Sequence, residues 1–324
     1  MSLLWQRRAR FRRLSVRGLR HFRLHHLQLP RCYTLQIMST ETSRATADAE
    51  RSEKGRLAGA LSESVTAIAA IAPMLCEPDI RTTQASQLLH GHIAEVVERR
   101  GLWLHVKGAD GYDGWVHSGY VVTIPAPVPA PARTGWNDPR PLSLGCTVRD
   151  EHGATRKLPL GALITEGEER FGGLAMTLDE RRHAFPPLAD SITASAMTFF
   201  EGTSYEWGGV TPWGCDCSGL ISSSYHLHGL HVPRDAWMQA NTGEPVEMDE
   251  LQPADLLFFS DEPEGKITHV AMSLGGTRVV HLALGRGGYA VDDLASEDEY
   301  CRLLRSRYRF ARRVLGVDRG LNGN

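Results

Sequence analysis

The stretch Trp213–Leu220, WGCDCSGL, decides the fold of this 324-residue chain. It places Cys215 and Cys217 one residue apart, after a glycine-rich run and directly before a segment with helical character. Such a pair has three interpretations: half of a zinc site, half of a disulfide, or a nucleophile beside a bystander cysteine.

Zinc and disulfide chemistry fit this spacing poorly. Structural zinc sites usually take a Cys-x₂₋₄-Cys pair and a second pair at similar spacing, and here neither condition is met. The nearby histidines, His226, His228 and His231, are expected on the exposed end of a helix. A disulfide across a single residue is strained. We therefore expect no metal and no other cofactor.

A nucleophilic role for Cys217 fits its surroundings. It stands where a glycine-rich loop enters a helix, with Asp216 and Ser218 as cap-like neighbours. The unpaired N–H groups and the positive end of the helix dipole stabilise a thiolate there, and the same N–H groups can hold an oxyanion.

Two histidines are placed to complete such a site. His269, in ITHVAMSLG, and His281, in RVVHLAL, lie in strand-like segments separated by a turn at Gly275-Gly276. A hairpin of these strands presents both imidazoles on one face. One imidazole then serves as the base of the thiol and the other orients it, which predicts a Cys-His-His site.

Composition and charge exclude several classes of protein. The formal net charge of −2 argues against a nucleic-acid-binding protein, and no run approaches the roughly 18 apolar residues of a membrane span. Residues 1–37 carry nine arginines and no acid, and their longest apolar run, Leu3–Trp5, is too short for a secretory signal. We expect a cytoplasmic protein with reduced cysteines, and leave open whether residues 1–37 belong to the working protein.

The chain divides by composition into several parts. Short β-like segments with regular turn signals indicate small β-units, and helices followed by antiparallel strands indicate an α+β domain. In chain order we predict a disordered Arg-rich leader and polar lead-in (1–63), a small β-barrel (64–124), a Pro/Ala linker (125–135), a second β-unit (136–190) and the α+β domain (191–318).

Several motifs in order resemble the NlpC/P60 family of papain-like cysteine peptidases, over roughly residues 195–312. The segment before them, QLLHGHIAEVVERRGLWLHVKGADGYDGWVHSGYV, is similar to bacterial SH3-like domains. The motifs are YEWGG (205–209), DCSGL (216–220), VPRD (232–235) with Gln239, LQPADL (251–256), FF (258–259), THV (268–270) and His281.

The resemblance implies a fold and an activity. The fold is α+β: a papain-like NlpC/P60 catalytic domain preceded by two small SH3-like β-barrels. The subgroup with two such barrels comprises γ-D-glutamyl-L-diamino acid endopeptidases, thiol proteases of cell-wall recycling. Their partners are peptidoglycan stem peptides, L-Ala-γ-D-Glu-diamino acid, whose L-Ala amine is free. Which diamino acid is tolerated, and the oligomeric state, do not follow from it.

The resemblance also implies roles for residues. Cys217 is the nucleophile, His269 the base and His281 the orienting residue. Substrate-binding residues are implied at the cleft and around the L-Ala end: Tyr205, Asp216, Ser218, Asp235 and Tyr112. The sequence departs from the subgroup at His92, where the subgroup has a glutamate, and a neutral imidazole does not replace a carboxylate as an amine partner.

Three other functions remain as alternatives. The first is a cell-wall hydrolase with an open groove. The second is an acyltransferase or amidase on the same fold. The third is a non-catalytic protein that binds cell-wall peptides, which the presence of all three catalytic residues disfavours.

Overall fold

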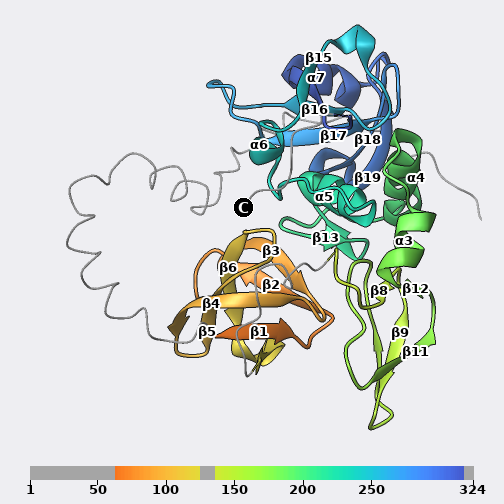
Figure 1. The fold of residues 1–324 in the computed structure, drawn as a ribbon. Coiled ribbons are helices and arrows are strands. Elements are labelled where there is room, and N and C mark those ends of the chain that lie inside the picture. The colour runs from red at the N-terminus through yellow and green to blue at the C-terminus, as the bar shows by residue number, and fades with distance from the viewer. Residues whose placement is uncertain (1–62, 125–135, 317–324) are drawn as a thin grey trace, which may run out of the picture. The chain divides into compact units, whose positions relative to one another are not determined.

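The computed structural model describes residues 63–124 and 136–316 (Figure 1). The leader and lead-in predicted for 1–63, apart from Glu63, lie outside the described residues, as does the linker predicted for 125–135. None of the helices within the described ranges is long and apolar enough to cross a membrane. Helices and antiparallel sheets together make the fold α+β, as predicted.

The first β-unit is a sheet of seven antiparallel strands in the order β3-β2-β6-β5-β4-β1-β7. Alternation along β5 explains its core, because Leu104 and Val106 are buried while Trp103 and His105 are only half-buried. The short helix η1 (Ser118–Tyr120) leads into the last strand. The strands are β1 (Ser64–Ala67), β2 (Ile71–Leu75), β3 (Gln84–Leu89), β4 (Ile93–Arg100), β5 (Trp103–Lys107), β6 (Asp113–His117) and β7 (Val121–Ile124).

The second β-unit is smaller and has two sheets. One has the order β10-β9-β11 and the other pairs β12 with β8. Helix α3 (Leu178–Ala184) follows and begins with a capping box between Thr177 and Glu180. The division of this region at 136 and 190 stays a prediction. Its strands are β8 (Leu142–Ser143), β9 (Thr147–Asp150), β10 (Thr155–Lys157), β11 (Glu168–Gly172) and β12 (Ala175–Met176).

The C-terminal domain is built on a six-stranded antiparallel sheet in the order β15-β20-β16-β17-β18-β19. A small ribbon of two strands, β13 (Val210–Thr211) and β14 (Gly214–Cys215), precedes the cysteine helix. The sheet strands are β15 (Glu244–Val246), β16 (Leu256–Phe259), β17 (His269–Ser273), β18 (Arg278–Ala283), β19 (Gly288–Asp293) and β20 (Tyr308–Arg313). The helices are α4 (Ala189–Phe200), α5 (Cys217–Leu227), α6 (Ala236–Gln239) and α7 (Glu299–Arg307), with short η3 (Met248–Glu250) and η4 (Leu284–Arg286).

Both faces of this sheet are covered, which explains the unbroken apolar run of β16. Leu256 and Phe258 pack in one core with α4 and α5, and Leu257 and Phe259 pack in another with Leu304 of α7. Each such side chain contributes roughly 1.5–3 kcal/mol on burial. Helix α5 packs against β17 and β18 of this sheet.

Candidate active site

Cys217 is the first residue of α5, as the sequence predicts. Asp216 caps the helix, and its carboxylate accepts a hydrogen bond of 2.7 Å from the backbone N–H of Gly219. A Cβ at position 219 would come within 2.1 Å of the carbonyl oxygen of Gly209, so only glycine fits there. The helix start is thus packed tightly against the glycine-rich loop.

Burial dominates the acidity of the Cys217 thiol. The side chain is 7% exposed, and this burial raises its pKa to about 12, an effect that the charge of Asp216 reinforces. The backbone N–H of Val270, the charge of Arg234 and the backbone N–H of Ser218 act in the opposite direction and lower the pKa. The helix terminus therefore favours the thiolate, as expected, but does not outweigh burial by itself.

Cys215 and Cys217 are both free thiols. Cys215 is fully buried, and burial raises the pKa of its thiol well above its ordinary value. Its sulfur points back to the carbonyl oxygen of Asp216 at 3.4 Å. These features suit a packing residue. Cys146 and Cys301 are free thiols as well, in keeping with the expectation of reduced cysteines at these positions.

The two predicted histidines meet. Nε2 of His269 and Nδ1 of His281 lie 2.9 Å apart, from the neighbouring strands β17 and β18. Burial, with the nearby His281, lowers the pKa of His269 well below its usual range. Because Val270 contributes its N–H at the Cys217 sulfur, the thiol lies beside the start of the strand that carries His269.

The histidine pair continues to a carboxylate that the sequence interpretation missed. Nε2 of His281 lies 3.0 Å from Oδ2 of Asp292 on β19. Asp292 in turn pairs with Arg286, whose Nη2 lies 2.7 Å from Oδ1. The signal was weak, because Asp292 and Asp293 are adjacent acids that resemble a turn.

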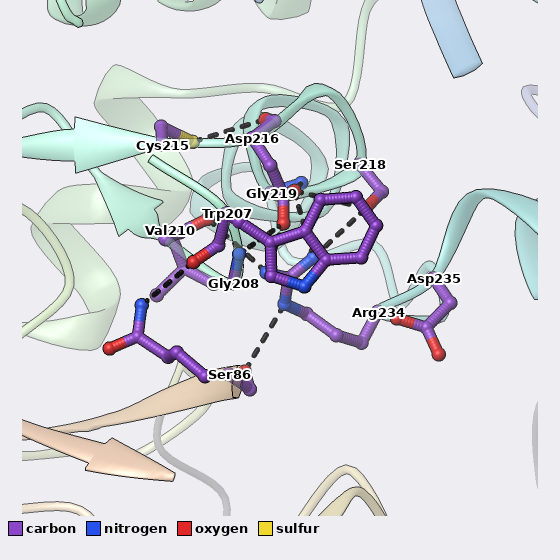
Figure 2. A network of polar contacts seen from close by, with 12 residues as sticks. Ser86, Trp207, Gly208, Val210, Cys215, Asp216, Ser218, Gly219, Arg234 and Asp235 are labelled. Atoms are coloured by element: carbon purple, nitrogen blue, oxygen red, sulfur yellow. Dashed lines mark hydrogen bonds and ion pairs between the residues drawn. The ribbon is translucent and has the colours of Figure 1, made fainter. Parts of the chain in front are cut away.

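Arg234, which the sequence interpretation included in the VPRD motif without a role, organises the loop around Cys217 (Figure 2). Its side chain is 4% exposed, and its Nη2 lies 2.8 Å from Oδ2 of Asp216. It also donates to Ser218 Oγ at 2.9 Å and to Ser86 Oγ at 3.1 Å. The side chains of Asp216 and Ser218 are thus engaged with Arg234, and direct contact between either of them and a substrate stays a prediction.

Strand β3 of the first β-unit is joined to the same loop. The side-chain amides of Gln84 and Gln87 each donate to Oε1 of Glu206 at 3.1 Å. The Gln87 oxygen accepts from the N–H of Val210 at 3.0 Å, and Ser86 accepts from Arg234. The β-unit therefore supports the loop that leads to Cys217.

Asp235 and Tyr112, predicted at the L-Ala end, are brought together. The Tyr112 hydroxyl lies 3.2 Å from Oδ1 of Asp235, a contact between the first β-unit and the C-terminal domain. Asp235 is 5% exposed, and burial raises its pKa while the charge of Arg234 opposes that change. His92 lies elsewhere: its Nε2 contacts the Gly161 carbonyl at 2.8 Å, and burial lowers its pKa to about 4.

Tyr205 is held close to the cysteine loop. It forms an isolated parallel bridge with Cys215, and its N–H donates to the carbonyl of Gly287 at 3.1 Å. Burial raises the pKa of its hydroxyl, and the Cys217 thiol raises it further. The phenol therefore stays protonated and available as a donor near the sulfur.

Within residues 63–124 and 136–316, no group of three or more His, Cys, Asp or Glu side chains is arranged to hold a metal ion. His228 is buried rather than exposed, so that expectation was wrong: its Nε2 contacts Ser195 Oγ at 3.0 Å. His226 and His231 stack on each other with ring centroids 5.5 Å apart.

Comparison with known proteins agrees with this geometry. The NlpC/P60 family matches residues 202–306, and the bacterial SH3 domain matches residues 77–122. The gamma-D-glutamyl-L-lysine dipeptidyl-peptidase of Bacillus subtilis is 30% identical over 235 residues, which cover 64% of this chain and 74% of that protein. Dipeptidyl-peptidase 6 of Lysinibacillus sphaericus is 27% identical over 259 residues, which cover 70% of this chain and 90% of that protein.

Solved structures share the fold. An NlpC/P60 family protein from Bacillus cereus superposes with a TM-score of 0.62 at 20% sequence identity, covering 78% of this chain and 99% of that one. The predicted α+β fold, with an NlpC/P60 domain after a bacterial SH3-like domain, is confirmed, and so is peptidase activity as the enzyme class. The chain belongs to the NlpC/P60 family of cysteine peptidases.

Proposed function

We propose that this peptidase hydrolyses the bond between γ-D-Glu and the diamino acid of peptidoglycan stem peptides with a free N-terminal L-Ala. Relatives named gamma-D-glutamyl-L-lysine dipeptidyl-peptidase support this substrate class. Cys217 is the nucleophile, His269 the base and His281 the residue that orients His269. Release of L-Ala-γ-D-Glu in the cytoplasm, during recycling of wall peptides, is the role that we assign.

The chemistry follows from the arrangement of these groups. His269 takes the proton of the Cys217 thiol as the sulfur attacks the γ-carbonyl carbon, and the N–H groups at the start of α5 face the developing oxyanion. The imidazolium then returns the proton to the leaving amine, and the C–N bond breaks to leave a thioester. Water, deprotonated by His269, hydrolyses the thioester and frees the thiol.

The single observation that carries the proposed substrate is the buried carboxylate of Asp235. It is 5% exposed and accepts a hydrogen bond from the Tyr112 hydroxyl, whereas its neighbour Arg234 is directed to Asp216 and Ser218 (Figure 2). A buried carboxylate is costly without a cationic partner. The ammonium of a free L-Ala provides that cation. His92 is neutral and hydrogen-bonded to the Gly161 carbonyl, so it does not bind the ammonium, and that role falls to Asp235 and Tyr112.

The experiment compares L-Ala-γ-D-Glu-diaminopimelate with its N-acetyl form, on the wild type and on Asp235→Asn. We expect the wild type to cleave the free peptide and to refuse the acetylated one. Asp235→Asn should lower kcat/KM for the free peptide by roughly 30-fold or more, because the substrate ammonium loses its carboxylate partner. This corresponds to a loss of about 2 kcal/mol of transition-state stabilisation. For the acetylated peptide, the substitution should change kcat/KM less. Asp179→Asn, at a side chain that is 94% exposed, serves as the control.

Other results point to the alternatives. Equal wild-type rates on both peptides would refute recognition of the amine and favour a hydrolase with an open groove. Transfer of the dipeptide to an added amine in place of water would favour an acyltransferase. Cell fractionation tests the cytoplasmic location.

A further inference from the structure

Beyond the predicted triad, a chain of polar contacts runs from the histidine pair into the domain. His269 Nε2 contacts His281 Nδ1 at 2.9 Å, and His281 Nε2 contacts Asp292 Oδ2 at 3.0 Å. Arg286 donates two hydrogen bonds to the same carboxylate, from Nε to Oδ2 at 3.1 Å and from Nη2 to Oδ1 at 2.7 Å. This series is unbroken from the base to the arginine.

Strand register explains how these groups meet. His281 pairs with Ala290 and Val279 with Asp292 across β18 and β19, so His281 and Asp292 are diagonal neighbours on one face of the sheet. The pairing of Met272 with Val280, continued along β17, puts His269 on that face as well. Asp293 alternates to the other side and is exposed. Three adjacent strands thus each supply one member of the series.

The carboxylate determines which ring nitrogens carry protons. An ionised carboxylate only accepts hydrogen bonds, so His281 must donate through Nε2–H. Its Nδ1 is then the acceptor and takes a hydrogen bond from Nε2–H of His269. The proton of neutral His269 is thereby assigned to Nε2. Its Nδ1 keeps a lone pair, which is what a base for the Cys217 thiol requires.

Arg286 keeps Asp292 in the accepting state. Burial alone raises the pKa of Asp292, but hydrogen bonds from His281 and Arg286 outweigh it and lower the pKa to about 2. Arg286 is itself held by Asp298, the cap of α7, at 2.7 Å and lies over the Tyr300 ring at 4.5 Å. Both oxygens of the Asp292 carboxylate are thus fixed in place.

We propose that Asp292, held by Arg286, is a positioning residue that sets the tautomer of the His281–His269 pair and so leaves Nδ1 of His269 free to accept the thiol proton. Asp292 touches neither substrate nor thiol and acts through His281. The proposal uses the proposed function only for its turnover assay.

The first measurement needs no substrate. Two-bond ¹H–¹⁵N correlation spectra of the ¹⁵N-histidine-labelled protein near neutral pH report which ring nitrogen bears the proton. We expect His269 and His281 both to be Nε2–H tautomers in the wild type. Asp292→Asn offers Arg286 only one acceptor oxygen and brings an NH₂ group to the site, so both rings should shift toward Nδ1–H. The exposed neighbour provides the control Asp293→Asn, which should leave the spectra unchanged.

The second measurement is turnover of L-Ala-γ-D-Glu-diaminopimelate. Asp292→Asn should lower kcat by about 10- to 100-fold at nearly unchanged KM. The reason is that a His269 ring with its proton on Nδ1 cannot accept the thiol proton, whereas substrate binding does not depend on the tautomer. Asp293→Asn should stay within about twofold of the wild type. In the His281→Ala variant, adding Asp292→Asn should lower kcat no further, because Asp292 acts through His281 and that residue is already gone.

Several outcomes would overturn the proposal. One is a proton on Nδ1 of His269 in the wild type, a result that does not depend on any variant being folded. Others are wild-type tautomers in Asp292→Asn, or an equal loss of kcat with and without His281. If the wild type does not cleave this peptide, the proposed function fails, and the spectra still decide on the tautomer.

Discussion

Replacing Arg234 with methionine tests the support of the cysteine loop most directly. The side chains of Arg234 and Asp216 are 4% and 9% exposed and pair at 2.8 Å. The substitution therefore leaves the buried Asp216 carboxylate without its cationic partner. Loss of one partner of a buried ion pair typically costs about 3–5 kcal/mol. Asp216 keeps hydrogen bonds from Gly208, Gly219 and Ser218, so we expect the lower end, about 3 kcal/mol.

Urea denaturation followed by tryptophan fluorescence measures this change. With a slope of about 2–3 kcal/mol per molar urea, a loss of about 3 kcal/mol moves the midpoint down by about 1–1.5 M. Arg81 pairs with Asp79 on the surface at 2.6 Å, and its side chain is 85% exposed, so Arg81→Met is the matched control and should not move the midpoint.

A second variant separates the stranded charge from lost packing. When Asp216→Asn is already present, Arg234→Met should lower the free energy of unfolding much less than it does alone, because no buried charge is then left unpaired. An Arg234→Met midpoint as high as that of Arg81→Met would refute the reasoning that the buried pair supports the loop.

The remaining predictions concern the thiol. Cys217→Ala should abolish hydrolysis while Cys215→Ala keeps it, as peptide cleavage assays will show; the reverse result would make Cys215 the nucleophile. Alkylation by iodoacetamide, mapped by mass spectrometry, should occur at Cys217 ahead of Cys146, Cys215 and Cys301 in the wild type, because Nδ1 of His269 accepts the thiol proton as the sulfur reacts. In His269→Ala the thiol, whose pKa burial raises to about 12, stays protonated at neutral pH, so alkylation should fall and then rise with pH through the alkaline range. Identical pH profiles in the two proteins would contradict the pairing of Cys217 with His269.

Much of the candidate site was accessible from local patterns. The glycine-rich loop before an apolar helical segment predicted Cys217 at a helix start, and the structure has it there. Alternation in two strands around a Gly-Gly turn predicted that His269 and His281 share a face, and their ring nitrogens meet at 2.9 Å. These features depend on residues no more than 12 positions apart, within one helix start or one hairpin, where local backbone geometry decides which side chains are neighbours.

The sequence by itself determined the α+β class and the family resemblance, and it predicted Cys217 as the nucleophile with His269 and His281 as its partners. Only the tertiary structure decided which of two adjacent acids, Asp292 or Asp293, turns inward to His281, and that burial outweighs the helix terminus at the Cys217 thiol. It alone brought Gln87 of β3 against Val210, 123 residues away, and Arg234 against Asp216. The physical reason is that such contacts arise from strand register and packing between segments far apart in the chain, which no local periodicity encodes.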